Sequence, residues 1–207
     1  MEASDQMQNY FKDLETRVME LYEIAKKARS RGFDPVSNVE IPLAKDLAAR
    51  VEGLVSSIYP QLSESGLAEK IRELENKYGK NDDRVTLESA AAVAREEFCK
   101  FNCLEECLDA GLRVGVAYNT LGIVTAPLEG ISALRIKNRQ DGGKYVAVYF
   151  AGPIRSAGGT ANAFAVIIAD YLRKMFDIGE YDPADDEVER FVIELDDYDS
   201  KVTNLQY

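Results

Sequence analysis

A glycine-rich segment with one arginine contains the residue types best suited to chemistry in this sequence. An apolar stretch that ends at Phe150 runs into residues 152–160, after which an apolar helix is expected. Glycines before a helix let a ligand approach the backbone, and the first helical N–H groups then face it with the positive end of the helix dipole. Arg155 adds a bidentate donor and Ser156 a hydroxyl group. We therefore predict an anion site, above all for phosphate, at Arg155, Ser156, Gly158, Gly159 and Thr160.

The spacing of these glycines excludes two familiar phosphate motifs. No Gly-Lys-Ser/Thr follows them, as the P-loop would require, and they lack the spacing of the dinucleotide-binding fingerprint. A tight connection between a strand and a helix would use the same glycines, so this purely structural interpretation stays open.

The residues just before this segment predict a basic β-hairpin. Arg135, Lys137 and Arg139 alternate with other residues and so share one side of a strand. Residues 140–143 form a turn, and Lys144 begins a returning strand over residues 144–150. These bases could follow a phosphate backbone without reading sequence. Alternatively, they keep the hairpin soluble and protect the edge of the sheet from pairing.

The glycine-rich segment, GPIRSAGGT, resembles a signature near the start of the large subunit of archaeal family D DNA polymerases. Further blocks are similar and come in the family's order: YNTLGIVTAPLEG at 118–130, ADYLRK at 169–174, YDP at 181–183 and VTNLQY at 202–207. The strong similarity covers a little under half of the chain. Before about Leu112 the sequence resembles the family only in its amphipathic character.

The resemblance implies a replicative DNA-directed DNA polymerase as parent protein, of which this chain is a truncated N-terminal piece. In that family the metal-binding aspartates lie in a two-barrel core far beyond residue 207, so no catalytic residue and no cofactor is expected here. Magnesium and a structural zinc are implied for the parent. The implied partners are DNA, a small subunit that carries a proofreading exonuclease and completes a heterodimer, and a sliding clamp.

The net charge of −11 at first argues against contact with DNA, but the acids are unevenly distributed. Residues 177–207 contain 11 acids and two bases, whereas residues 1–176 contain 25 acids and 23 bases. The body of the chain is therefore nearly neutral and has room for a local basic face. Paired Asp196 and Asp197 are interpreted as part of a solvated helix face and not as a metal site.

Composition predicts a cytoplasmic globular protein. Hydrophobic residues make up 46% of the chain, no secretory signal is visible, and the apolar patch at 163–169 is too short to cross a membrane. Cys99, Cys103 and Cys107 recur every fourth residue, and the chain has no histidine to complete a metal site with them. We expect reduced cysteines, buried in a helix seam.

The expected fold class is α+β, mainly helical, with a small β-hairpin that leads through the glycine-rich turn into a buried helix. Apolar periodicity predicts helices over 5–31, 45–58, 67–78, from Thr86 through the cysteines to Tyr118, over 160–176, and from Asp182 onward. Gly111 and Gly115 are interpreted as breaks or close-packing points. A polar turn divides the chain into a helical region at 1–80 and an α+β module at 81–207.

Three functions are consistent with these patterns. The first is a noncatalytic polymerase module that contributes to DNA holding or subunit assembly. The second is a stand-alone phosphate- or nucleotide-binding enzyme that uses residues 152–160. The third is a helical assembly module that self-associates through its long first helix.

Overall fold

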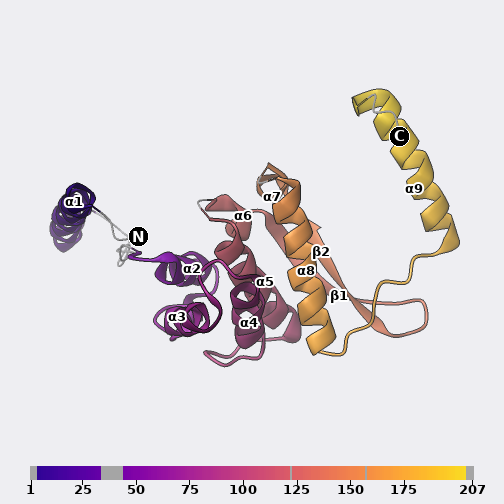
Figure 1. The fold of residues 1–207 in the computed structure, drawn as a ribbon, viewed down its shortest axis with the longest axis horizontal. Helices are drawn as coiled ribbons and strands as arrows, with labels where there is room; N and C mark the ends of the chain where they lie inside the picture. The colour runs from indigo at the N-terminus through magenta and orange to yellow at the C-terminus, as the bar shows by residue number, and fades with distance from the viewer. Residues whose placement is uncertain (1–3, 34–43, 122, 157, 204–207) are drawn as a thin grey trace.

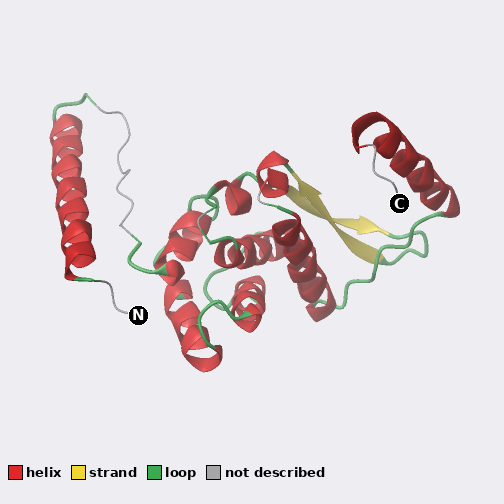
Figure 2. Cartoon of the chain, turned by 45° about the horizontal axis from the view of Figure 1, so that its top comes forward, coloured by secondary structure: helices red, strands yellow, loops and turns green. Residues whose placement is uncertain are grey.

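Helices and one antiparallel pair of strands build the chain (Figures 1 and 2). The computed structural model describes residues 4–33, 44–121, 123–156 and 158–203, without the side chains of 155, 156, 202 and 203. In chain order the elements are α1 Asp5–Ser30, α2 Leu47–Ser56, η1 Pro60–Leu62, α3 Leu67–Tyr78, α4 Asp83–Ala94, α5 Leu104–Asn119, α6 Thr125–Leu128, β1 Ile131–Asn138, β2 Lys144–Phe150, α7 Gly152–Ser156, α8 Gly159–Met175, α9 Asp185–Tyr198 and η2 Asp199–Thr203. The predicted mainly helical α+β class is confirmed.

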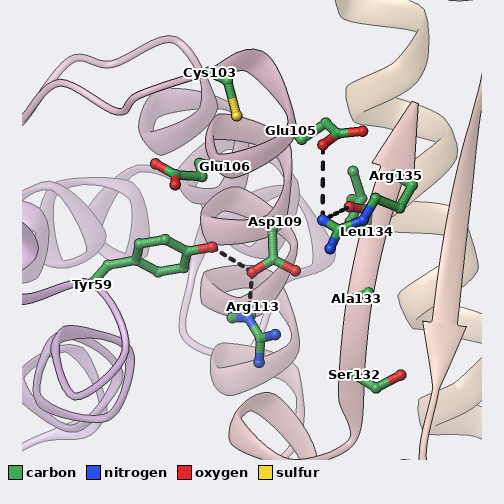
Figure 3. Close-up of a pocket in the computed structure, with 10 residues that line it drawn as sticks. All are labelled: Tyr59, Cys103, Glu105, Glu106, Asp109, Arg113, Ser132, Ala133, Leu134 and Arg135. Atoms are coloured by element: carbon green, nitrogen blue, oxygen red, sulfur yellow. Dashed lines mark hydrogen bonds and ion pairs between the residues drawn. The ribbon is translucent and has the colours of Figure 1, made fainter. Parts of the chain in front are cut away.

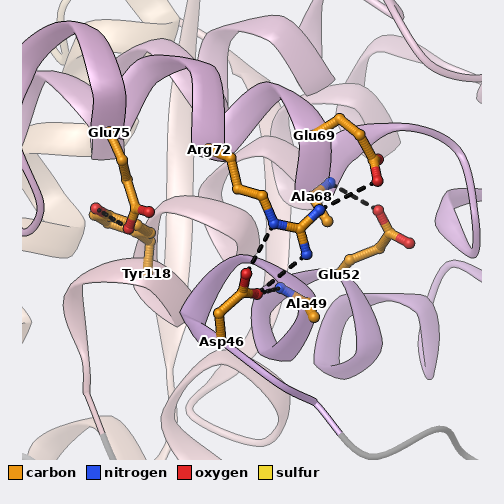
Figure 4. A network of polar contacts seen from close by, with 8 residues as sticks. All are labelled: Asp46, Ala49, Glu52, Ala68, Glu69, Arg72, Glu75 and Tyr118. Atoms are coloured by element: carbon orange, nitrogen blue, oxygen red, sulfur yellow. Dashed lines mark hydrogen bonds and ion pairs between the residues drawn. The ribbon is translucent and has the colours of Figure 1, made fainter. Parts of the chain in front are cut away.

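Helices α2 and α3 pack against α4 and α5 around a first hydrophobic cluster. Val51, Ile71, Val85 and Val114 are fully buried in it. Polar contacts fix the same helices from outside (Figure 4). The Arg72 guanidinium donates to both carboxylate oxygens of Asp46, the N-cap of α2, over 2.8 and 3.2 Å, and lowers the pKa of that carboxyl. Because this cluster draws on both sides of residue 80, the division of the chain there stays a prediction.

A second cluster lies where α4, α5 and α8 pack against one another. Gly111 and Gly115 let the helices approach closely: a Cβ at Gly111 would lie 2.6 Å from the Ala90 carbonyl oxygen, and one at Gly115 would lie 2.9 Å from Ile168 Cδ1. Both glycines are therefore close-packing points within α5, as the sequence suggested.

The expected continuous helix from Thr86 to Tyr118 is wrong, because α4 ends at Ala94 and α5 begins at Leu104. Glu96 has a left-handed φ of 60°, and its carboxylate accepts the Phe101 N–H at 2.9 Å, which stabilises the non-helical connection. Thr86 is buried inside α4; the capping carboxylate belongs to Asp82, which accepts the Arg84 N–H at 2.9 Å.

This break also overturns the predicted cysteine seam. Cys99 lies in the connection, Cys103 is the exposed residue before α5, and only Cys107 is buried within that helix. All three are free thiols, as expected.

Helix α8 is buried on one side only, which corrects the expectation of a central helix. Ala165, Ile168 and Leu172 pack into the second cluster, while Val166 and Ile167 are half exposed.

The two outermost helices contact the rest of the structure sparsely. Neither α1 nor α9 contains a buried residue, and both lie apart from the packed body (Figure 1). Among the described residues, no helix combines the length and the apolar character that crossing a membrane requires.

Candidate nucleic-acid interface

The β-hairpin presents two different faces, which its register defines. Leu134, Ile136, Val146 and Val148 share one side and pack onto the second cluster. Residues paired directly across an antiparallel sheet point to the same side. The other side is here called the outer hairpin face, and it consists of Ala133, Arg135, Lys137, Tyr145, Ala147 and Tyr149.

This outer hairpin face combines cations with an open aromatic ring. Lys137 Nζ lies 5.1 Å from the centre of the Tyr149 ring, and Tyr149 is 40% exposed. The hydrogen-bonding contact with Tyr149 raises the pKa of Lys137 above its ordinary value, so the ammonium stays charged well beyond neutral pH. The Arg135 side chain is 59% exposed, and its Nη1 lies 3.8 Å from a Glu105 oxygen, which is a loose pair. Such a surface can attract phosphate and stack a base.

The other two predicted bases of the hairpin are placed differently. Arg139 is drawn in by Asp141 at 3.1 Å and Asp182 at 3.8 Å, so its charge is largely compensated. Lys144 is exposed, but its partner across the strands is Asn138. Both therefore lie on the opposite side of the hairpin from Lys137. The structure therefore brings only Arg135 and Lys137 together as open cations on the outer hairpin face.

The first part of the glycine-rich segment is a short helix, α7, where the sequence predicted a turn, and Gly158 comes before the next helix, α8. Pro153 suits the first turn of α7, and Ile154 is fully buried, so packing holds this segment in place. Gly158, with φ of 102°, precedes α8, and Gly159 and Thr160 are exposed in its first turn. The predicted donors of Arg155 and Ser156 are side chains outside the described part of the structure. Because α7 directly follows β2, this segment borders the Tyr149 end of the outer hairpin face.

A cavity of about 290 Å³ between α5 and β1 lies beside this face (Figure 3). Its carboxylates already serve the fold: Glu105 accepts the Ile136 N–H at 2.7 Å, and Asp109 accepts the Arg113 Nε–H and the Tyr59 hydroxyl, both at 2.6 Å. Within the described ranges, no group of three or more cysteine, aspartate or glutamate side chains could hold a metal ion. The cavity network therefore positions β1, and with it Arg135.

Comparison with known proteins decides the family. The family model described as "DNA polymerase II large subunit DP2, N-terminal" matches residues 9–207. The chain belongs to this family.

Three relatives named DNA polymerase II large subunit illustrate the match. The protein of Nanoarchaeum equitans is 47% identical over 96% of this chain and 16% of its own length. Those of Methanothermobacter thermautotrophicus and Methanococcus vannielii are each 48% identical, over 97% and 99% of this chain and 18% and 17% of their own lengths. The chain thus spans less than a fifth of the length of these relatives, and the resemblance to the archaeal polymerase family is confirmed.

Sequence reasoning missed Tyr145 and Tyr149, the two tyrosines of the outer hairpin face. The signal was present, because counting back from the turn pairs Tyr145 with Lys137 and Tyr149 with Ala133. Alternation was applied to the bases of the first strand, and extending it across the hairpin would have found the aromatic residues.

Proposed function

We propose that this chain is a noncatalytic N-terminal module of a replicative DNA polymerase large subunit, and that its outer hairpin face holds DNA. The family and the printed names of the relatives support the polymerase context. The parent protein, on this proposal, is a cytoplasmic DNA-directed DNA polymerase whose magnesium-binding aspartates and structural zinc lie outside these 207 residues. A small exonuclease subunit and a sliding clamp complete the proposed assembly.

The observation that carries DNA holding is the contact between Lys137 and Tyr149, with Arg135 two residues away on the same side. Both cations can neutralise phosphates, and the exposed ring offers a stacking surface that every base fits. The contacts involve backbone and base faces rather than base edges, so binding should be independent of sequence. Of the C-terminal acids, Asp182 reaches the hairpin, at Arg139 and Gln140 near its tip, while the body of α9 lies apart from the strands that carry Lys137 and Tyr149 (Figure 2).

The test is fluorescence anisotropy with labelled oligonucleotides over a range of salt concentrations. Replacing Arg135 and Lys137 by alanine should weaken binding for all sequences alike and reduce the slope of log K against log salt by about 1 to 2. Lys77→Ala with Arg84→Ala is the matched control, because it removes the same charge from another cation–tyrosine contact, at Tyr78. Equal losses in both double variants, or binding that ignores salt, would contradict the proposal.

A contribution to assembly is supported by the exposed apolar stripe of α1. Phe11, Leu14 and Leu21 are 54%, 36% and 62% exposed along this helix of 26 residues. Helices of this kind usually bury such a stripe against a partner. Light scattering should show an oligomer that Leu14→Glu dissociates and that Met19→Glu, on another side of α1, leaves intact; a monomeric parent chain would refute self-association.

A further inference from the structure

Helix α9 exposes a continuous apolar stripe that no described part of the chain covers. At about 100° per residue, Val188, Phe191 and Val192 fall within one third of the helix circumference, and Tyr198 extends the stripe. Their exposed fractions are 50%, 52%, 58% and 56%. Half-exposed apolar side chains in one row on an amphipathic helix mark a surface made for contact.

The charge of α9 restricts what can cover this stripe. Residues 185–198 contain seven acids and one base, Arg190, a net charge of −6. Glu189 and Asp196 border the stripe on one side and Glu187 borders it on the other. DNA is excluded as the occupant by like charge, and a second copy of the helix would bring two acidic rims together. The complementary surface is an apolar groove with lysine or arginine along its edges.

The base of α9 is fixed to the body, so the stripe does not sit on a loose tail. The Tyr181 ring packs on Tyr145 with ring centres 4.8 Å apart, and its hydroxyl donates to Glu187 in the first turn of α9. One residue later, Asp182 accepts the Gln140 N–H at 2.9 Å at the tip of the hairpin. These contacts place the start of α9 beside the hairpin tip, where Figure 1 shows it.

An isolated helix of 14 residues is marginal in water, and acidic self-repulsion weakens it further. A surface that covers its apolar stripe would therefore stabilise α9. The relatives are more than five times as long as the aligned region, since the chain covers 16–18% of their lengths. A segment of the same polypeptide is held near α9 at a high effective concentration. This favours such a segment over a separate subunit as the partner of the stripe.

We propose that α9 docks, through the stripe of Val188, Phe191 and Val192, into a basic-edged apolar groove formed by the part of the large-subunit polypeptide beyond these 207 residues. This docking joins the N-terminal module to the rest of the subunit at the tip of its hairpin. It is independent of DNA holding, and the two proposals can fail separately.

Hydrogen–deuterium exchange followed by mass spectrometry tests the docking in the full-length large subunit, purified without other subunits. The amides of 185–198 should exchange at least about tenfold more slowly there than in the 207-residue chain. Val192→Asp should remove most of this protection, while Ile193→Asp should retain it. The two positions are adjacent aliphatic residues, 58% and 65% exposed, but Ile193 lies about 100° farther round the helix and outside the stripe.

Peptides from the hairpin serve as the folding control and should exchange equally in both variants. If either aspartate variant disturbs them, Val192→Ser and Ile193→Ser replace the pair, with the same expected contrast. Equal exchange of 185–198 in the full-length subunit and in the 207-residue chain would overturn the proposal. Equal effects of the two substitutions would do so too, and so would protection that appears only after the small subunit is added.

Discussion

Arg113 lies where α5, α6 and β1 meet, and its replacement by methionine should destabilise the fold strongly. Its side chain is 8% exposed, and its Nε donates to Asp109 over 2.6 Å. The other guanidinium nitrogens donate to the carbonyl oxygens of Pro127, Leu128 and Ile131 over 2.8, 2.7 and 2.8 Å. Figure 3 shows the guanidinium below Asp109.

The expected loss follows from what the substitution leaves behind. Arg113→Met leaves a buried carboxylate without its cation and three carbonyl groups without their donors. Removing one partner of a buried ion pair costs about 3 to 5 kcal/mol. In a domain of this size the Tm should fall on the order of 10 °C. Urea unfolding followed by circular dichroism measures both the free energy and its slope.

Two comparisons separate this reasoning from a general effect of losing an arginine. Arg95→Met removes a 53% exposed guanidinium that lies 3.7 Å from Glu97, and should change the free energy of unfolding by less than about 0.5 kcal/mol. The double variant Asp109→Leu with Arg113→Met removes both buried charges and should be more stable than Arg113→Met alone. A cost below about 1 kcal/mol for Arg113→Met, or a double variant less stable than the single one, would refute the argument.

Three further predictions concern packing, pH and thiol reactivity. Gly111→Ala should lower the free energy of unfolding, measured in urea, by about 1 to 3 kcal/mol, because the new Cβ would meet the Ala90 carbonyl oxygen. Gly53→Ala, in α2 with open space around it, should instead raise it by about 0.5 to 1 kcal/mol. A stabilising Gly111→Ala would contradict the close approach of the helices. Burial, with help from Glu75, raises the pKa of Tyr118 from 10.0 to about 12, so the stability that depends on the neutral hydroxyl is complete below pH 10.0 and is lost as the pH rises toward 12. The free energy of unfolding should decline less steeply over that pH window in Tyr118→Phe. Identical pH profiles of the two proteins would count against this role of the Tyr118 hydroxyl. Maleimide should label exposed Cys103 in the folded protein but reach Cys107, whose burial raises its thiol pKa, only on unfolding; equal rates would show that α5 opens locally.

Much of the secondary structure follows from local sequence. The predicted third helix and returning strand match α3 and β2 at both ends, because Gly79 and the turn at 140–143 are strong local signals. The break between α4 and α5 could not be predicted from local sequence, since glutamate, the residue at position 96, usually favours helices. Glu96 departs from the helix because its carboxylate finds the Phe101 N–H five residues later.

Sequence alone does not show the surroundings of a side chain where distant residues decide them. Arg135 and Lys137 are open cations of the outer hairpin face, as alternation indicates. Arg139 looks equivalent in the sequence, but Asp182, more than 40 residues away, compensates it. Only the path of the chain after α8 brings this carboxylate to the hairpin tip, and no local pattern encodes that path.

The stacked tyrosines and the Asp182 contact make the corner between the hairpin and α9 a stiff joint. Short, well-anchored connections transmit rotation, whereas flexible linkers absorb it. A rotation of α9 would therefore be passed, through these contacts, to the strands that carry Lys137 and Tyr149. If this face holds DNA, as proposed, these contacts at the start of α9 help to set the angle at which it meets the nucleic acid.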